Sequence, residues 1–135
     1  MINIEDSWYR ISIKALILND KWEFLLCKEN SWIWDFPWWW LDHFENPINC
    51  LKRELKEEMW LEIDEIEENP EYFITAYKEK SKTRPYIANI FYKVKLKNLN
   101  FKKSDECVEI WFFNKESIKD IDAIENVKQF FKQYN

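Results

Sequence analysis

Residues 38–61, WWWLDHFENPINCLKRELKEEMWL, decide the fold of this 135-residue chain. Asn46 directly precedes Pro47, a pair typical of a helix start, with Asn as the N-cap and Pro at the first helical position. Apolar residues then recur at spacings of three and four and predict an amphipathic helix over 47–59. This apolar stripe consists of Ile48, Leu51, Leu55 and Met59.

Three carboxylates, on Glu54, Glu57 and Glu58, fall together beside that stripe when the helix turns by about 100° per residue. Like charges on one helix face repel one another, and near an apolar edge water screens them less. Mg²⁺ or Mn²⁺ would relieve the repulsion, because a hard cation takes oxygen ligands from a few carboxylates and from substrate phosphates. Arg53 can pair with Glu57, four residues further on. The alternative is a solvated acidic face on an ordinary helix.

The same stretch resembles the Nudix box of the Nudix hydrolase family, whose pattern is G-x5-E-x7-R-E-U-x-E-E-x-G-U with U aliphatic. The aliphatic positions match at Leu55 and Leu61, whereas both glycine positions hold tryptophan, Trp39 and Trp60. The preceding residues 34–37, WDFP, resemble the lead-in W-x-x-P-G-G, again with tryptophan where glycine is expected. All charged positions match, at Glu45, Arg53, Glu54, Glu57 and Glu58.

The resemblance implies a hydrolase that uses Mg²⁺ or Mn²⁺ to cleave a nucleoside diphosphate linked to another moiety. A nucleoside triphosphate, an oxidised purine nucleotide, a nucleotide sugar and ADP-ribose all fit as substrates. Glu54 would bind metal or act as a base toward water, and Arg53 would orient Glu57 or a neighbour. The implied metal ligands are Glu57, Glu58, Glu54, Glu45 and the backbone carbonyl of Trp38.

Three further residues are candidates for contact with substrate. Arg84 belongs to the basic run 78–84, which is either a phosphate-steering loop or a solvated hairpin tip. Phe36 could stack on a base, although core packing is the commoner fate of an aromatic side chain. Glu109 lies with Glu106 in a late stretch that resembles the Glu-containing strand of Nudix domains, and an exposed strand edge is the alternative.

The chain contains no glycine and nine tryptophans, whereas average usage would supply roughly nine glycines. Trp22 stands in a turn that begins at Asn19, and Trp60 follows the helix where a left-handed glycine is expected. Residues 38–40 lie where the backbone would approach phosphate and metal. We interpret the written sequence as a systematic replacement of Gly by Trp, either through a codon that genetic codes read differently or through deliberate recoding.

Alternating apolar residues flank the box and predict strands on both sides of it. Strands with one helix after the second hairpin and one at the end predict a Nudix-like α/β/α sandwich, a mixed sheet with helices on both faces. The length predicts one domain over residues 1–135. The expected strands are 9–18, 23–28, 61–66, 72–77, 85–96 and 106–114, followed by a helical turn over 116–121 and a helix over 122–134.

The net charge of -5 argues against binding of a nucleic acid polymer or an anionic membrane. Without a stretch of transmembrane length or a signal-peptide pattern, a cytoplasmic monomer or homodimer with a small nucleotide substrate is expected. A non-catalytic Nudix-like module that binds a nucleotide or a partner is the competing class. The complete charged set favours the enzyme, and the Trp-filled segment favours the module.

The replacement hypothesis predicts the intact mass of the protein isolated from its native source. That mass should fall below the mass of the written sequence by one Trp-to-Gly difference for each replaced position. Peptide sequencing across residues 38–61 would locate the replacements. A mass that matches all nine tryptophans would contradict the hypothesis.

Overall fold

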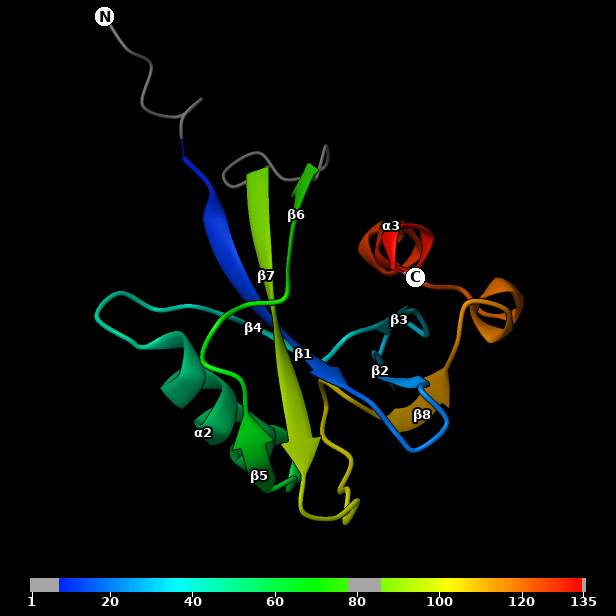
Figure 1. Cartoon of the computed structure of the whole chain (residues 1–135), viewed down its shortest axis with the longest axis horizontal. Coiled ribbons are helices and arrows are strands. Elements are labelled where there is room, and N and C mark those ends of the chain that lie inside the picture. Colours follow the sequence, from blue (N-terminus) through cyan, green and yellow to red (C-terminus); the bar gives the residue numbers. More distant parts are fainter. Residues whose placement is uncertain (1–7, 78–85, 135) are drawn as a thin grey trace, which may run out of the picture.

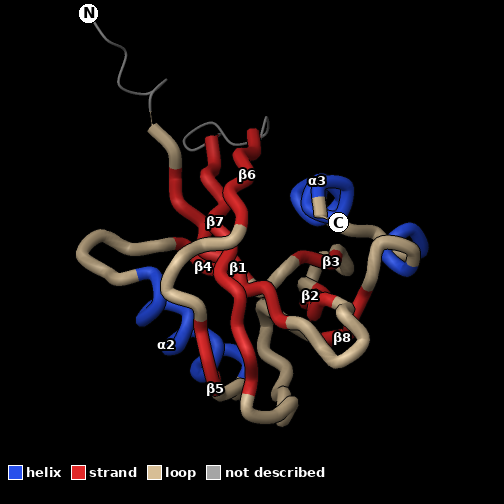
Figure 2. The backbone as a smooth tube through the Cα atoms, viewed as in Figure 1, coloured by secondary structure: helices blue, strands red, loops and turns tan. Residues whose placement is uncertain are grey.

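The structure, a computed structural model, describes residues 8–77 and 86–134. Figure 1 and Figure 2 show strands in the middle of the molecule, with α2 and α3 well apart on its two sides. The elements are β1 (Arg10–Ile17), β2 (Phe24–Lys28), β3 (Trp34–Asp35), β4 (Trp38–Trp40), α2 (Pro47–Met59), β5 (Ile63–Ile66), β6 (Tyr72–Tyr77), β7 (Tyr86–Leu96), β8 (Glu109–Phe113), the 3-10 helix η1 (Ser117–Asp120) and α3 (Glu125–Gln133).

Helix α2 begins and ends where the sequence predicts. The side chain of Asn46 accepts hydrogen bonds from the backbone N–H groups of Ile48 and Asn49, at 2.9 and 3.3 Å. Pro47 occupies the first turn, where its missing N–H has no helical partner in any case. At the other end, Trp60 adopts the left-handed conformation (φ 61°, ψ 23°) and its N–H bonds to the carbonyls of the last turn.

The strands form two sheets, where the sequence had predicted one. The larger sheet has five strands in the order β4-β1-β7-β5, and β6 also pairs with β7. Strands β1 and β7 run parallel while the other pairings are antiparallel, so this sheet is mixed. The smaller sheet is antiparallel, in the order β3-β2-β8. The predicted α/β fold with a mixed sheet and two helices is confirmed.

Two apolar clusters cover the two faces of the larger sheet. Ile13 and Tyr92 pack with the buried stripe of α2, including Leu51 and Leu55, in the first cluster. The second cluster joins the opposite face to α3 and is rich in aromatic rings. There Phe130 stacks on Phe91, with ring centroids 5.5 Å apart.

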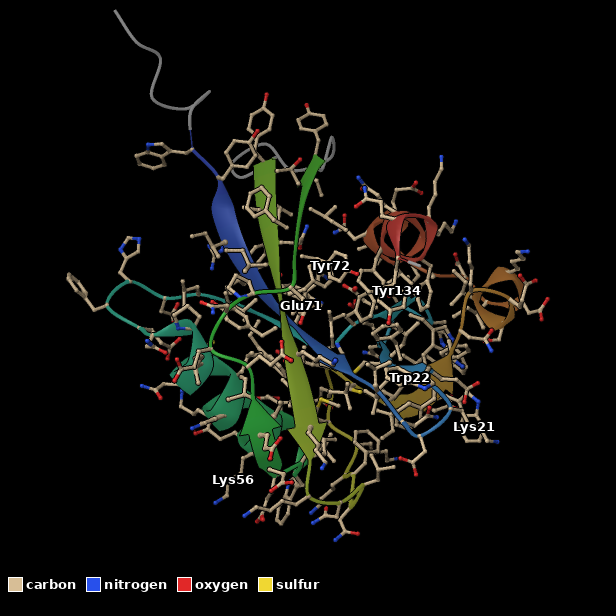
Figure 3. The ribbon with its side chains drawn as sticks, viewed as in Figure 1. Lys21, Trp22, Lys56, Glu71, Tyr72 and Tyr134 are labelled. Carbon is tan, nitrogen blue, oxygen red and sulfur yellow. The ribbon has the colours of Figure 1, made fainter. Side chains whose placement is uncertain are left out.

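The carboxyl-terminal segment is fixed to the rest of the fold through β3 and β6. The N–H of Trp34 donates to the carbonyl of Asp122 at 2.9 Å, and the N–H of Ile124 donates back to Trp34 at 3.0 Å. Near the end of α3, Tyr134 lies beside Tyr72 of β6, with ring centroids 6.0 Å apart (Figure 3). The expected helix over 122–134 therefore starts later, at Glu125, because the preceding residues bond to β3.

Two other boundaries differ from the prediction. Residues 38–40, which are not among the predicted strands, form β4 and pair with β1 in the register Lys14↔Trp38 and Ser12↔Trp40. The late strand begins at Glu109, so Glu106 lies outside it. A turn precedes that strand, because the side chain of Ser104 accepts a hydrogen bond from the N–H of Cys107 at 3.2 Å. Among the described residues, neither helix is long and apolar enough to cross a membrane.

Three tryptophans adopt the left-handed backbone conformation that favours glycine. The φ angles of Trp22, Trp32 and Trp60 are 62°, 70° and 61°, and all three side chains are exposed. Residues 38–40 lack positive φ angles, so the glycine-only dihedrals expected there are absent from β4. The backbone conformation therefore supports a replacement of Gly by Trp at the two turns and at the end of α2. It gives no support for such a replacement in β4.

Replacing Trp22 by Gly should stabilise the protein. Trp22 lies on the turn between β1 and β2 (Figure 3), and its N–H donates to the carbonyl of Asn19 at 3.1 Å. Glycine relieves the left-handed strain at the cost of a more flexible unfolded chain, for a net gain of about 0.5–1 kcal/mol. Urea unfolding measures this gain.

Trp111 provides the matched control, because it is similarly exposed (65% against 69% for Trp22) but lies in the middle of β8. Trp111→Gly should destabilise the fold by about 0.5–1 kcal/mol, since glycine weakens a strand interior. Equal changes in unfolding free energy for both variants would show that backbone conformation at residue 22 carries no preference for glycine.

Candidate functional site

Arg53 joins three carboxylates at the exposed edge of α2. Its Nη2 atom lies 2.8 Å from Oε2 of Glu45, and its Nη1 atom lies 2.8 Å from Oε1 of Glu54. The same Nη1 atom lies 3.3 Å from Oε2 of Glu57, one turn further along the helix. The pairing of Arg53 with Glu57 expected from their spacing is present. Because Glu45 precedes the helix, Arg53 also fixes the incoming loop to the acidic face.

This network changes the proton affinities of its members. The hydrogen bond from Arg53 lowers the pKa of the Glu45 carboxyl, and the bond to Glu45 raises the pKa of the Arg53 guanidinium. Burial raises the pKa of the neighbouring Cys50 thiol to about 12, and interaction with the Glu45 carboxylate adds to the rise. Glu45 therefore stays ionised and Cys50 stays a thiol at neutral pH.

Two carboxylates on the same helix hold protons more tightly than usual. Burial raises the pKa of Glu54, helped by the charges of Glu58 and Glu57 and opposed by Arg53. Burial also raises the pKa of Glu58, and the charges of Glu106 and Glu57 add to the effect. The charges of Glu58 and Glu106 thus act on each other, so the turn before β8 lies near the acidic face of α2.

A cavity of about 380 Å³ opens beside this acidic face. Its walls come from the β2–β3 loop, from β4, from the end of α2 and from the turn before β8. Most of its polar groups are acidic or neutral: it is lined by Glu29, Asn30, Ser31, Glu58, Asp105 and Glu106, among others. A polyphosphate would enter such a cavity only together with cations, because the carboxylates repel it.

The three candidates for substrate contact outside the box lie in different surroundings. Phe36 is fully buried and its ring packs edge-to-face on Phe24 and Phe130, as in core packing, and the residue also belongs to the cavity lining. Glu109 lies 3.6 Å from the ammonium group of Lys28 and does not line the cavity, whereas Glu106 does. Arg84 and the basic run 78–84 lie outside the described residues.

The sequence analysis missed two features of this region. Lys14, in the strand expected over 9–18, is only 2% exposed and forms a buried ion pair with Asp35 at 2.9 and 3.0 Å. Glu29 accepts a hydrogen bond from the indole Nε1 of Trp38 at 3.1 Å on the cavity wall. The alternating pattern gave no signal for either, because both depend on which segments meet in space.

The donor set of this region suits a hard divalent cation, since it consists of carboxylate oxygens, and burial together with neighbouring carboxylates raises the pKa of Glu54 and of Glu58. Within the described residues, no three acidic, His or Cys side chains are already gathered around one point in a metal-binding arrangement. Arg53 explains this, because it holds Glu54 and Glu57 through their oxygens.

Comparison with known proteins places this geometry in a family. The family model described as the NUDIX domain matches residues 8–134. No curated protein matches the sequence. Among solved structures, the crystal structure of a MutT protein from Methanosarcina mazei superposes with a TM-score of 0.71 at 25% identity, covering 93% of this chain and 91% of that chain.

Two other structures show the same fold at lower identity. The solution structure of the E. coli ORF135 protein gives a TM-score of 0.74 at 15% identity, with 96% of this chain and 91% of that chain covered. A crystal structure of an ADP-ribose pyrophosphatase from Streptococcus suis gives 0.65 at 23% identity, with 93% and 87% covered. With a family model that spans nearly the whole chain and a box whose charged residues meet around Arg53, this protein belongs to the NUDIX domain family.

Proposed function

We propose that the chain is a metal-dependent hydrolase that cleaves a nucleoside diphosphate linked to another moiety. The observation that carries the proposal is the Arg53 network, which holds Glu45, Glu54 and Glu57 together next to an acidic cavity. A charge cluster of this kind is costly to a fold unless it binds a cation. Glu58, on the same helix, lines the cavity, and this position favours a role in chemistry over a role in stability.

The residues present fit Mg²⁺ or Mn²⁺. We assign Glu54, Glu57 and Glu58 as ligands, with Glu45 as a supporting carboxylate and the backbone carbonyl of Trp38 as a further oxygen donor. Glu106 joins this set in place of Glu109, because its charge acts on Glu58. When bound, the metal would screen the pyrophosphate, lower the pKa of water and stabilise the leaving oxygen.

The protein's own groups then have limited tasks, as is usual when a phosphoryl group is transferred to water. Glu54 is suited to accept a proton from the attacking water, because burial holds its pKa above the ordinary value for a carboxyl. Arg53 keeps Glu54 and Glu57 in place through hydrogen bonds of 2.8 and 3.3 Å. The acidic walls of the cavity favour a nucleotide that enters together with its own cations.

A non-catalytic nucleotide-binding module is the second candidate. One observation favours it: the indoles of Trp38 and Trp40 pack against each other at the cavity, with ring centroids 5.0 Å apart. Chromatography of the products from a panel of nucleotides, with and without Mg²⁺, separates the two functions. The hydrolase should yield a nucleoside monophosphate plus pyrophosphate or the phosphorylated second moiety, and the module should yield no product.

Glu57→Gln should lower kcat by at least about 100-fold while the fold persists, because it removes one charged ligand and keeps the size of the side chain. Steady-state kinetics measures the loss of kcat, and circular dichroism checks that the fold persists. Both measurements use whichever form of the chain hydrolyses nucleotide, with the written residues or with glycine at positions 38–40. Glu116→Gln is the control, since Glu116 is 80% exposed and pairs with Lys119. Full activity of Glu57→Gln would remove Glu57 from the site.

Metal affinity should fall as the pH drops from 8 to 5. The pKa values of Glu54 and Glu58 are raised, so protons compete with metal at a higher pH than for ordinary carboxyls. Affinity is therefore full above the raised pKa values and is lost as the pH falls through them, by about tenfold per pH unit for each protonated ligand. Mn²⁺ titrations followed by electron paramagnetic resonance measure this. Affinity that stays constant over the range would exclude both carboxylates as ligands.

A further inference from the structure

Three sulfur-containing side chains, those of Cys27, Met59 and Cys107, line the cavity of about 380 Å³. They come from β2, from the last residue of α2 and from the turn before β8, so three segments that are distant in the sequence supply them. Each residue is at most 5% exposed, and both cysteines are free thiols. The proposed hydrolysis uses none of the three, so the cluster requires an explanation of its own.

Cys27 contacts both other members of this sulfur cluster. Its Sγ atom lies 3.8 Å from the Sδ atom of Met59. Burial raises the pKa of the Cys27 thiol and the Cys107 thiol adds to the rise, so the two thiols lie close to each other. The backbone holds Cys107 in this position, because the N–H of Val108 donates to the carbonyl of Lys28 at 2.9 Å. The fold therefore gathers two thiols and one thioether without any ligand.

The separation of the sulfur atoms suits a shared metal ion. Metal–sulfur bonds of about 2.3 Å place two sulfur ligands of one ion roughly 3.8–4.0 Å apart in a tetrahedral or trigonal arrangement. The Cys27 to Met59 distance of 3.8 Å already meets this requirement. Thiolate and thioether sulfurs are soft ligands, and together they select Cu(I) over hard cations.

The composition of the cluster also argues against zinc. Structural zinc sites take four ligands from Cys, His and carboxylate side chains. In the part of the chain that the structure describes, no three such side chains are gathered around one point. The third donor of the sulfur cluster is instead a methionine, which is a typical ligand of Cu(I).

We propose that Cys27, Met59 and Cys107 bind a single Cu(I) ion at the cavity wall. The ion displaces the protons of the two thiols to solvent, and neither copper nor sulfur changes its oxidation state. This site is distinct from the carboxylate site for Mg²⁺ or Mn²⁺, because hard and soft cations prefer different donors. The two sites share one cavity, since Met59 directly follows Glu58 in the chain and both line it.

Competition for Cu(I) with the chromophoric chelator bicinchoninate, in the absence of oxygen and with ascorbate present, tests the site. The full chain should retain one Cu(I). Cys27→Ser should weaken the affinity at least about 100-fold because it removes a thiolate, and Met59→Leu, which keeps the apolar volume, should weaken it about tenfold. Cys50→Ser is the matched control, because Cys50 is also buried on α2 but does not line the cavity, and it should leave the affinity unchanged.

X-ray absorption spectroscopy of the copper complex should show sulfur ligands alone, at about 2.3 Å. Nitrogen or oxygen ligands, or an equal loss of affinity in Cys27→Ser and Cys50→Ser, would overturn the proposal. Loss of two thiols without bound copper would indicate a disulfide and would also refute it, as would tighter binding of Zn²⁺ than of Cu(I). Circular dichroism checks each variant, and Cys107→Ser replaces Cys27→Ser if the latter fails to fold.

The Cu(I) site and the hydrolase can be refuted separately. Glu57→Gln should leave the affinity for Cu(I) unchanged, and an excess of Mg²⁺ should not displace the ion, because neither change affects a sulfur ligand. Displacement of Cu(I) by Mg²⁺ would place copper on the carboxylates and would contradict the proposal. Retention of Cu(I) by a chain that hydrolyses no nucleotide would support the sulfur site and refute the hydrolase alone.

Discussion

The guanidinium group of Arg53 is the interaction on which the candidate site depends. It reaches back to Glu45 ahead of α2 and sideways to Glu54 and Glu57 on the helix. Arg53 is 41% exposed, so these ion pairs contribute little to stability. Their effect is orientation: the planar guanidinium fixes carboxylates that would otherwise repel one another and point into solvent. The helix supplies the spacing, and Arg53 sets the orientation of Glu45, Glu54 and Glu57.

The sequence predicted the features that depend on local spacing. The capping pair Asn46-Pro47, the apolar stripe and the pairing of Arg53 with Glu57 all occur as expected, because each involves residues within a few turns of one helix. The features that it failed to predict depend on contacts between distant segments. Residues 38–40 became a strand because β1 offers them a partner, and Lys14 is buried because Asp35 lies opposite its ammonium group.

The choice between Glu106 and Glu109 could not be made from the sequence for the same reason. The strand expected over 106–114 did not indicate which of the two residues would lie near α2. The turn at Ser104 removes Glu106 from the strand and leaves it next to Glu58, while the pairing of β8 with β2 directs Glu109 toward Lys28. One physical argument also bears on the tryptophans: Trp22, Trp32 and Trp60 have the left-handed backbone that favours glycine.

The central claim is that the face of α2 organised by Arg53 binds a divalent cation. Paramagnetic broadening of backbone amide signals by substoichiometric Mn²⁺ tests it most directly, because the effect falls steeply with distance and needs no substrate. The account predicts that the signals of residues 54–58 and of Glu106 broaden first, while those of α3 on the other side of the molecule stay sharp (Figure 1). Broadening centred on any other part of the chain, or no broadening at all, would contradict it.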